Sequence, residues 1–154
     1  MKTLIAYFSA ETGRTRKAAQ AIAKLTGGEL FEIKPQEEYT PSDLNWKNPL
    51  ARCNKEKMGK KDVPVAEKVE DFDSYDTVCL GFPIWYWSAP NVVNTFCKDY
   101  DWTGKKVYVF ATSGGSNIGK TAEKLMPYVE GAEIVHAEVL KNTEGLKEWV
   151  KKIV

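Results

Sequence analysis

The sequence has 154 residues, enough for one domain that buries about two-thirds of its unfolded surface. Hydrophobic residues make up 43% and charged residues 28%, an ordinary globular composition, and the formal net charge of +1 argues against nucleic acid as a partner. The apolar run at residues 4–8 is too short for a signal peptide, and no stretch is long enough to span a bilayer. We therefore expect one cytoplasmic domain, residues 1–154, that binds neither nucleic acid nor membrane.

Five short segments have the pattern of β-strands. Four are apolar runs bounded by turn residues, and the fifth alternates between apolar and polar residues as a strand at a sheet edge does. We expect strands at 3–8, 29–33 (the alternating segment), 76–81, 106–112 and 133–140.

Helical patterns lie between these strands, and we expect helices at 14–25, 91–99, 121–126 and 144–153. In the first helix, Ala18, Ala19, Ile22 and Leu25 recur at the spacing of one buried face. Strands that alternate with helices are typical of a parallel sheet, because parallel neighbours need crossover connections. The sequence therefore predicts an open α/β sandwich with helices on both faces of the sheet.

The segment at 35–71 is irregular, and we interpret it as an elaborated crossover within the single domain. Its basic run from Lys55 to Lys61 is typical of a solvated loop, and the alternative is a docking patch for an acidic partner. The three cysteines, Cys53, Cys79 and Cys97, are widely spaced and include no Cys-x-x-Cys pair. We expect reduced thiols that pack as small core residues, and no metal site.

The loops with unusual composition follow three of the expected strands. In an open parallel sheet, a ligand binds beyond the carboxyl ends of the strands, where the strand order reverses direction. In the order 2-1-3-4-5, this point lies between the first and third strands. The three loops follow Phe8, Gly81 and Ala111, so we expect them to form one site.

The first loop runs from Ser9 to Thr15 and leads directly into the first helix. Its hydroxyls, its glycine and the free amides of the helix start suit a phosphate. A helix cap without a ligand is the alternative. One glycine is too few for a dinucleotide fingerprint, which needs three, so a monophosphate suits this loop better than a pyrophosphate.

The second loop, at 81–90, contains two prolines and the consecutive aromatic residues Trp85, Tyr86 and Trp87. Three neighbouring large rings cannot all turn toward one core, so at least one ring faces solvent or a ligand. Stacking on a planar heterocycle contributes roughly 1–3 kcal/mol per face, which favours a flat ligand here. The alternative is an aromatic corner that packs on the preceding helix.

The third loop, at 112–119, is rich in small residues whose amides and hydroxyls can wrap the polar edge of a ring system. Residues 114–121 also match the P-loop pattern of enzymes that bind nucleoside triphosphates. Such an enzyme needs another strand that ends in Asp to hold magnesium, and the expected strand at 76–81 ends in Gly. Nucleotide hydrolysis is therefore disfavoured.

With these three loops, the chain resembles the flavodoxins over essentially its whole length. The loop at 9–15 is similar to the family's Ser/Thr-x-Thr-Gly-x-Thr phosphate signature, the segment at 83–87 to its first flavin-flanking loop, and the segment at 112–115 to its second. The resemblance implies a flavodoxin-like open sandwich, with a five-stranded parallel sheet of order 2-1-3-4-5 and one non-covalently held FMN.

By this resemblance, three groups of residues would bind FMN. The phosphate would be bound by Ser9, Ala10, Glu11, Thr12, Gly13, Arg14 and Thr15. The isoalloxazine would be flanked by Pro83, Ile84, Trp85, Tyr86 and Trp87, and its other edge lined by Thr112, Ser113, Gly114, Gly115 and Gly119. Arg14 stands where the family commonly has Asn, so a full positive charge would neutralise the phosphate there.

The resemblance implies an electron carrier that shuttles single electrons and supplies no acid, base or nucleophile of its own. Redox partner proteins would dock transiently on a monomer. The near-zero net charge departs from the strongly acidic balance common in the family, which leaves the identity of those partners open. The alternative is an FMN-dependent reductase that passes hydride from NADH or NADPH to a quinone or a nitro compound. His136, the single histidine, lies on a late strand away from the three loops and is expected to be structural.

Overall fold

The computed structural model describes residues 2–9, 14–35, 65–84, 89–112, 121–140 and 143–153. At its centre lies one sheet whose strands are β1 (Thr3–Tyr7), β2 (Glu29–Glu32), β3 (Thr77–Pro83), β4 (Lys106–Thr112) and β5 (Glu133–Val139). Every neighbouring pair is parallel, and the strand order is β2-β1-β3-β4-β5. The predicted order 2-1-3-4-5 is confirmed, and so is the position of the alternating strand at a sheet edge.

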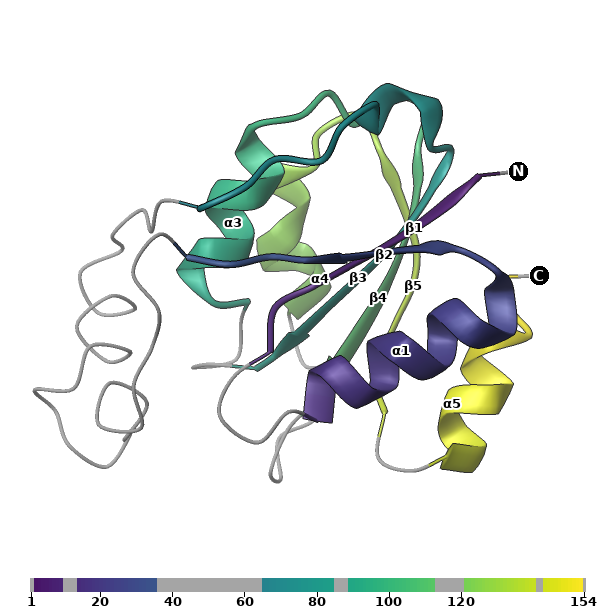
Figure 1. The fold of residues 1–154 in the computed structure, drawn as a ribbon. Helices are drawn as coiled ribbons and strands as arrows, with labels where there is room; N and C mark the ends of the chain where they lie inside the picture. Colours follow the sequence, from purple (N-terminus) through teal and green to yellow (C-terminus); the bar gives the residue numbers. More distant parts are fainter. Residues whose placement is uncertain are drawn as a thin grey trace, which may run out of the picture.

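Helices cover both faces of this sheet, as Figure 1 shows: α1 and α5 lie on one side, and α3 and α4 on the other. The helices are α1 (Arg14–Thr26), α3 (Asn91–Lys98), α4 (Thr121–Leu125) and α5 (Thr143–Val150), with short 3-10 turns η1 (Phe72–Ser74) and η2 (Met126–Tyr128). The flavodoxin-like open sandwich is therefore confirmed. In the part of the chain that the structure describes, no helix combines the length and the apolar character needed to cross a membrane.

Three predicted helices end earlier than expected: α3 ends at Lys98, one residue before its predicted bound, and the other two end early for local reasons. The helix predicted at 121–126 becomes a 3-10 turn after Leu125, because Pro127 lacks an amide and its ring disfavours α-helical geometry in the residue before it. The last helix ends at Val150. Beyond it, the amides of Lys152 and Ile153 bond to carbonyls three residues back, which tightens the chain into turns.

Apolar side chains form one cluster on each face of the sheet. On the α1 and α5 side, Ile5, Cys79 and Phe110 pack against Ile22 and Trp149. On the other side, the cluster combines residues of β1, β3 and β4 with α3, and includes Leu4, Leu80, Val109, Val93 and Phe96. Because both faces of the central strands are buried, these strands read as nearly continuous apolar runs in the sequence.

The prediction that Leu25 belongs to the buried face of α1 is wrong. Ala19 and Ile22 are fully buried, whereas Leu25 is 48% exposed. Leu25 lies in the last turn of α1, next to β2, which is the outermost strand of the sheet on that side. Leu30 of β2 is exposed as well, so apolar side chains at this edge of the sheet do not bury the end of the helix.

The two ends of the predicted crossover at 35–71 are joined to each other, and the later end is attached to the domain. Pro35 and Val65 form an isolated antiparallel bridge, and the amide of Val69 donates to the hydroxyl of Tyr100 at 2.8 Å. Residues 36–64, which include Cys53 and the basic run from Lys55 to Lys61, lie outside the described residues. Both interpretations of the basic run therefore stay predictions.

Cys79 on β3 and Cys97 on α3 are buried free thiols, so the prediction that they pack as core residues is confirmed. Burial raises the pKa of the Cys79 thiol to about 12, and it raises the pKa of Cys97 further. Within the described residues, no group of three or more His, Cys, Asp or Glu side chains is arranged to hold a metal ion.

Candidate cofactor site

The ends of β1, β3 and β4 meet at the carboxyl edge of the sheet. β1 and β3 are neighbours, and the chain leaves β1 toward β2 on one side and β3 toward β4 on the other. The edge between β1 and β3 is therefore the point at which the strand order reverses, and it is where an open α/β sheet binds its ligand.

The structure describes part of each predicted loop at this edge. The described residues are Ser9, Thr15, Pro83, Ile84 and Thr112, together with the backbone of Arg14. The remaining predicted site residues lie outside the described part of the chain: Ala10, Glu11, Thr12, Gly13, Trp85, Tyr86, Trp87, Ser113, Gly114, Gly115 and Gly119. Their predicted roles stay predictions.

The start of α1 has the character of an anion site. The helix begins at Arg14, and its first turn carries no acidic residue. The Oγ of Ser9 accepts a hydrogen bond from the amide of Arg16 at 3.3 Å, so the end of β1 is tied to the first turn of the helix. The positive end of the helix dipole at this turn favours a negatively charged ligand.

Among the described residues, a short polar contact joins two of the predicted loops through Thr15 and Thr112. Their Oγ1 atoms lie 2.7 Å apart, and the two residues are only 2% and 7% exposed. Thr15 belongs to the first turn of α1, and Thr112 is the last residue of β4. The structure thus brings the end of the predicted phosphate loop into direct contact with the start of the predicted third loop.

The second loop leaves β3 alongside the same threonine. Pro83 lies opposite Thr112 in the β3–β4 ladder, and the amide of Ile84 donates to the carbonyl oxygen of Thr112 at 3.0 Å. Pro83 and Ile84 are half-buried. Two residues earlier, Gly81 lies beneath the ring of Phe110, where a Cβ atom would collide with that ring.

A polar cluster that no motif of the sequence predicts lies beside the first loop. The Nη2 atom of Arg16 is 2.9 Å from Oε2 of Glu32, and the Tyr7 side chain lies beside both. Burial raises the pKa of Tyr7, and the negative charge of Glu32 raises it further. The sequence contains a signal for this cluster, because two arginines flank Thr15, but it does not show that Glu32 pairs with one of them.

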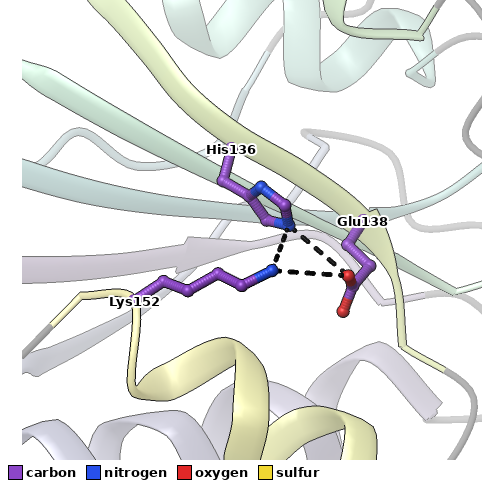
Figure 2. Close-up of polar contacts among 3 residues, drawn as sticks. All are labelled: His136, Glu138 and Lys152. Atoms are coloured by element: carbon purple, nitrogen blue, oxygen red, sulfur yellow. Dashed lines mark hydrogen bonds and ion pairs between the residues drawn. The ribbon is translucent and has the colours of Figure 1, made fainter.

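His136 lies away from these loops, as predicted. Figure 2 shows its side chain turned toward Glu138, also on β5, and toward Lys152 in the turns that follow α5. The Nε2 atom of His136 is 3.0 Å from the Lys152 Nζ and 3.4 Å from Glu138 Oε1. Val135 is one extra residue in β5 and shifts its register against β4. As a result, Ile134 and His136 lie on opposite faces of the sheet, although they are two positions apart.

Most of the P-loop match lies outside the described residues. Thr121, its last residue, begins α4, which has five residues. The strand that would need a terminal Asp for magnesium is β3, and it ends in Pro83. This ending agrees with the expectation that nucleotide hydrolysis is disfavoured.

Comparisons with known proteins agree with this geometry. The flavodoxin family model matches residues 2–153, and no curated protein matches the chain. A protein from Bacteroides eggerthii described as a flavoprotein is 36% identical, with 99% of this chain and 97% of that chain covered and a TM-score of 0.88. Another from Bacteroides uniformis is 38% identical, with 97% of each chain covered and a TM-score of 0.90.

A flavoprotein from Lactobacillus acidophilus, solved in complex with FMN, is 25% identical, with a TM-score of 0.72, and covers 96% of this chain and 97% of its own. The family match spans nearly every residue, and the two Bacteroides proteins share more than a third of the sequence over nearly the full length. This chain therefore belongs to the flavodoxin family.

Proposed function

We propose that this protein binds one FMN at the carboxyl edge of its sheet and uses it to carry single electrons between redox partner proteins. The observation that carries the proposal is the buried contact between Thr15 and Thr112. It joins the first turn of α1, which follows β1, to the end of β4, which lies beside β3. The contact therefore lies at the carboxyl edge where the strand order reverses between β1 and β3, and a phosphorylated planar ligand would span both loops there. The FMN complex of the Lactobacillus acidophilus relative supports the choice of cofactor.

The chain's own groups suit such a ligand. The acid-free start of α1 and the residues from Ser9 to Thr15 would hold the phosphate. Residues 83–87 would flank the isoalloxazine, and residues 112–115 with Gly119 would line its other edge. When bound, FMN supplies the ring that accepts and releases electrons, and the protein binds the ring, orients it and limits its contact with water.

The chemistry of the described site residues favours a carrier over a reductase. Ser9, Thr15 and Thr112 contribute hydroxyls, and Pro83 and Ile84 contribute apolar surface. None of these five side chains exchanges a proton near neutral pH. A carrier needs no such group, and its partners would dock transiently on a monomer.

An absorption spectrum of the purified protein tests the cofactor. We expect a yellow protein, or a colourless one that takes up added FMN to one equivalent. Reduction in small steps should then proceed through two separable one-electron stages. Protein that stays colourless with excess FMN would overturn the proposal at its first step.

A steady-state assay tests the carrier against the reductase. The purified protein, loaded with FMN and supplied with NADH or NADPH and a quinone or nitro compound, should show no turnover until a separate flavin-reducing protein is added. Sustained turnover by this protein alone would assign it as an FMN-dependent reductase instead.

A further inference from the structure

Thr112 makes a hydrogen bond to each of the two other loops of the site. We propose that Thr112 is a positioning residue that holds the phosphate loop at a set distance from the two loops around the flavin ring. This role rests on the proposed binding of FMN, and it differs from the contact with the ring edge that the sequence predicts for this residue.

The side chain of Thr112 provides the link to the phosphate loop. Its Oγ1 lies 2.7 Å from Thr15 Oγ1, and burial of both residues separates the bond from water. A buried hydroxyl without a partner is costly, so each threonine constrains the other. The two residues are 97 positions apart in the sequence, which means that the bond fixes α1 against β4 and not merely a local turn.

The backbone of Thr112 provides the link to the second loop. Its carbonyl oxygen accepts the hydrogen bond from the Ile84 amide at 3.0 Å, immediately after β3 ends. The third loop begins directly after Thr112 itself. One residue therefore connects the phosphate loop through its side chain and both flavin loops through its backbone.

This arrangement has a specific consequence for affinity. FMN has to contact the phosphate loop and the flavin loops at the same time, so it gains from a distance between them that is set before binding. Riboflavin lacks the phosphate and uses only the flavin loops, and inorganic phosphate uses only the phosphate loop. Loss of the side-chain link should therefore weaken FMN binding and leave binding of each fragment nearly unchanged.

The first test replaces Thr112 by valine, which keeps the branched shape and the backbone carbonyl and removes only the hydroxyl. Quenching of flavin fluorescence on titration of the apoprotein gives the dissociation constants of FMN and riboflavin. We expect Thr112→Val to weaken FMN about tenfold, the upper range for one lost hydrogen bond, and to change riboflavin less than about twofold. Thr112→Ser keeps the hydroxyl and should bind FMN like the unaltered protein.

A double-mutant cycle with Thr15 tests whether the two hydroxyls act as one unit. If the link is the relevant contact, the double variant with Thr15→Val and Thr112→Val loses FMN affinity by a much smaller factor than the product of the factors for the two single variants. Multiplicative effects would overturn the proposal. Should Thr112→Val fail to fold, Thr112→Ala removes the same hydroxyl and is compared with Thr112→Ser in its place.

Thr77→Val is the matched control, since Thr77 is also a buried threonine but lies at the opposite end of β3. It should leave the affinity for FMN unchanged. The proposal is wrong if Thr112→Val binds FMN normally, if it weakens riboflavin as much as FMN, or if Thr112→Ser is as weak as Thr112→Val. Failure of the unaltered protein to bind FMN would instead contradict the proposed function, so the two failures are distinguishable.

Discussion

The two ends of the parallel sheet bury polar side chains in different ways. At the amino end, Lys105 is only 6% exposed, and its Nζ donates to the carbonyl oxygens of Phe72 at 3.2 Å and Tyr75 at 2.5 Å. The same Nζ lies 4.8 Å from the centre of the Phe72 ring. At the carboxyl end, Thr15 and Thr112 pair one neutral hydroxyl with another.

This difference indicates what each end contributes. At the amino end, the Lys105 ammonium connects the backbone of η1 to the start of β4 through charge-assisted hydrogen bonds. Such bonds are roughly twice as strong as neutral ones. The hydroxyl pair at the carboxyl end is weaker, and it joins loops that face a ligand site. We expect the amino end to contribute mainly to the free energy of unfolding, and the carboxyl end mainly to binding.

Lys105→Met should give the largest effect and tests the amino end. It keeps the length of the side chain and removes the charged donor from both carbonyl oxygens, of which the Phe72 oxygen keeps its bond from the Tyr75 amide. The free energy of unfolding should therefore fall by about 2–3 kcal/mol in urea denaturation. Lys106→Met, at the exposed neighbouring position, is the control and should change it by less than about 0.5 kcal/mol. FMN affinity should be unchanged in both variants. A loss of affinity in Lys105→Met would mean that the two ends are coupled.

Gly81→Ala should give the next largest effect and tests the carboxyl end. The new Cβ collides with the Phe110 ring, so the free energy of unfolding should fall by about 1–3 kcal/mol, and FMN should bind more weakly because the second loop follows directly. Phe110→Leu in the same chain should restore part of the free energy of unfolding and part of the FMN affinity. Gly27→Ala, where φ is +74° and the space is open, should cost about 1 kcal/mol through backbone strain without affecting FMN.

The buried thiol of Cys79 tests whether the middle of the sheet, between the two ends, stays dry. Its folded pKa of about 12 exceeds the ordinary thiol value, so the stability that it contributes is complete below about pH 8.5 and is lost as the pH rises toward 12. The raised pKa values of Cys97 and Tyr7 act in the same direction. In Cys79→Ala, the decline of the unfolding free energy between about pH 9 and 11 should be shallower by up to about 1.4 kcal/mol per pH unit. An identical decline in both proteins would show that water reaches this thiol.

Glu138→Gln should give the smallest effect, because it alters a contact at an edge strand and at neither end of the sheet. The Lys152 Nζ lies 3.8 Å from Glu138 Oε1 in the cluster of Figure 2, and both side chains are more than a third exposed. Water screens such pairs, so the loss should be about 0.5 kcal/mol at low salt and smaller at high salt. Glu148→Gln, which breaks the more exposed pair with Lys151, is the control and should have almost no effect.

Particular residues show how far prediction from the sequence extends. The strand at 106–112 agrees with the structure, because burial on both of its faces leaves a continuous apolar run. Ala19 and Ile22 of α1 agree as well, because burial on one face of a helix leaves a periodic apolar pattern. Leu25 fails, since periodicity shows which side of a helix is apolar but not where the sheet beneath it ends. The burial of Lys105 cannot be predicted from the sequence, because its partners are backbone carbonyl groups about 30 positions away. Every residue has such a group, so no residue type marks these partners.

The sequence by itself determined the fold class, the strand order implied by the family resemblance, and the three loops at one edge of the sheet. These features depend on local patterns of burial and turn residues, which the order of amino acids records directly. The tertiary structure decided which groups meet there. Contact between Thr15 and Thr112 depends on the register of three strands and the placement of α1, and no local pattern encodes a distance between side chains 97 positions apart.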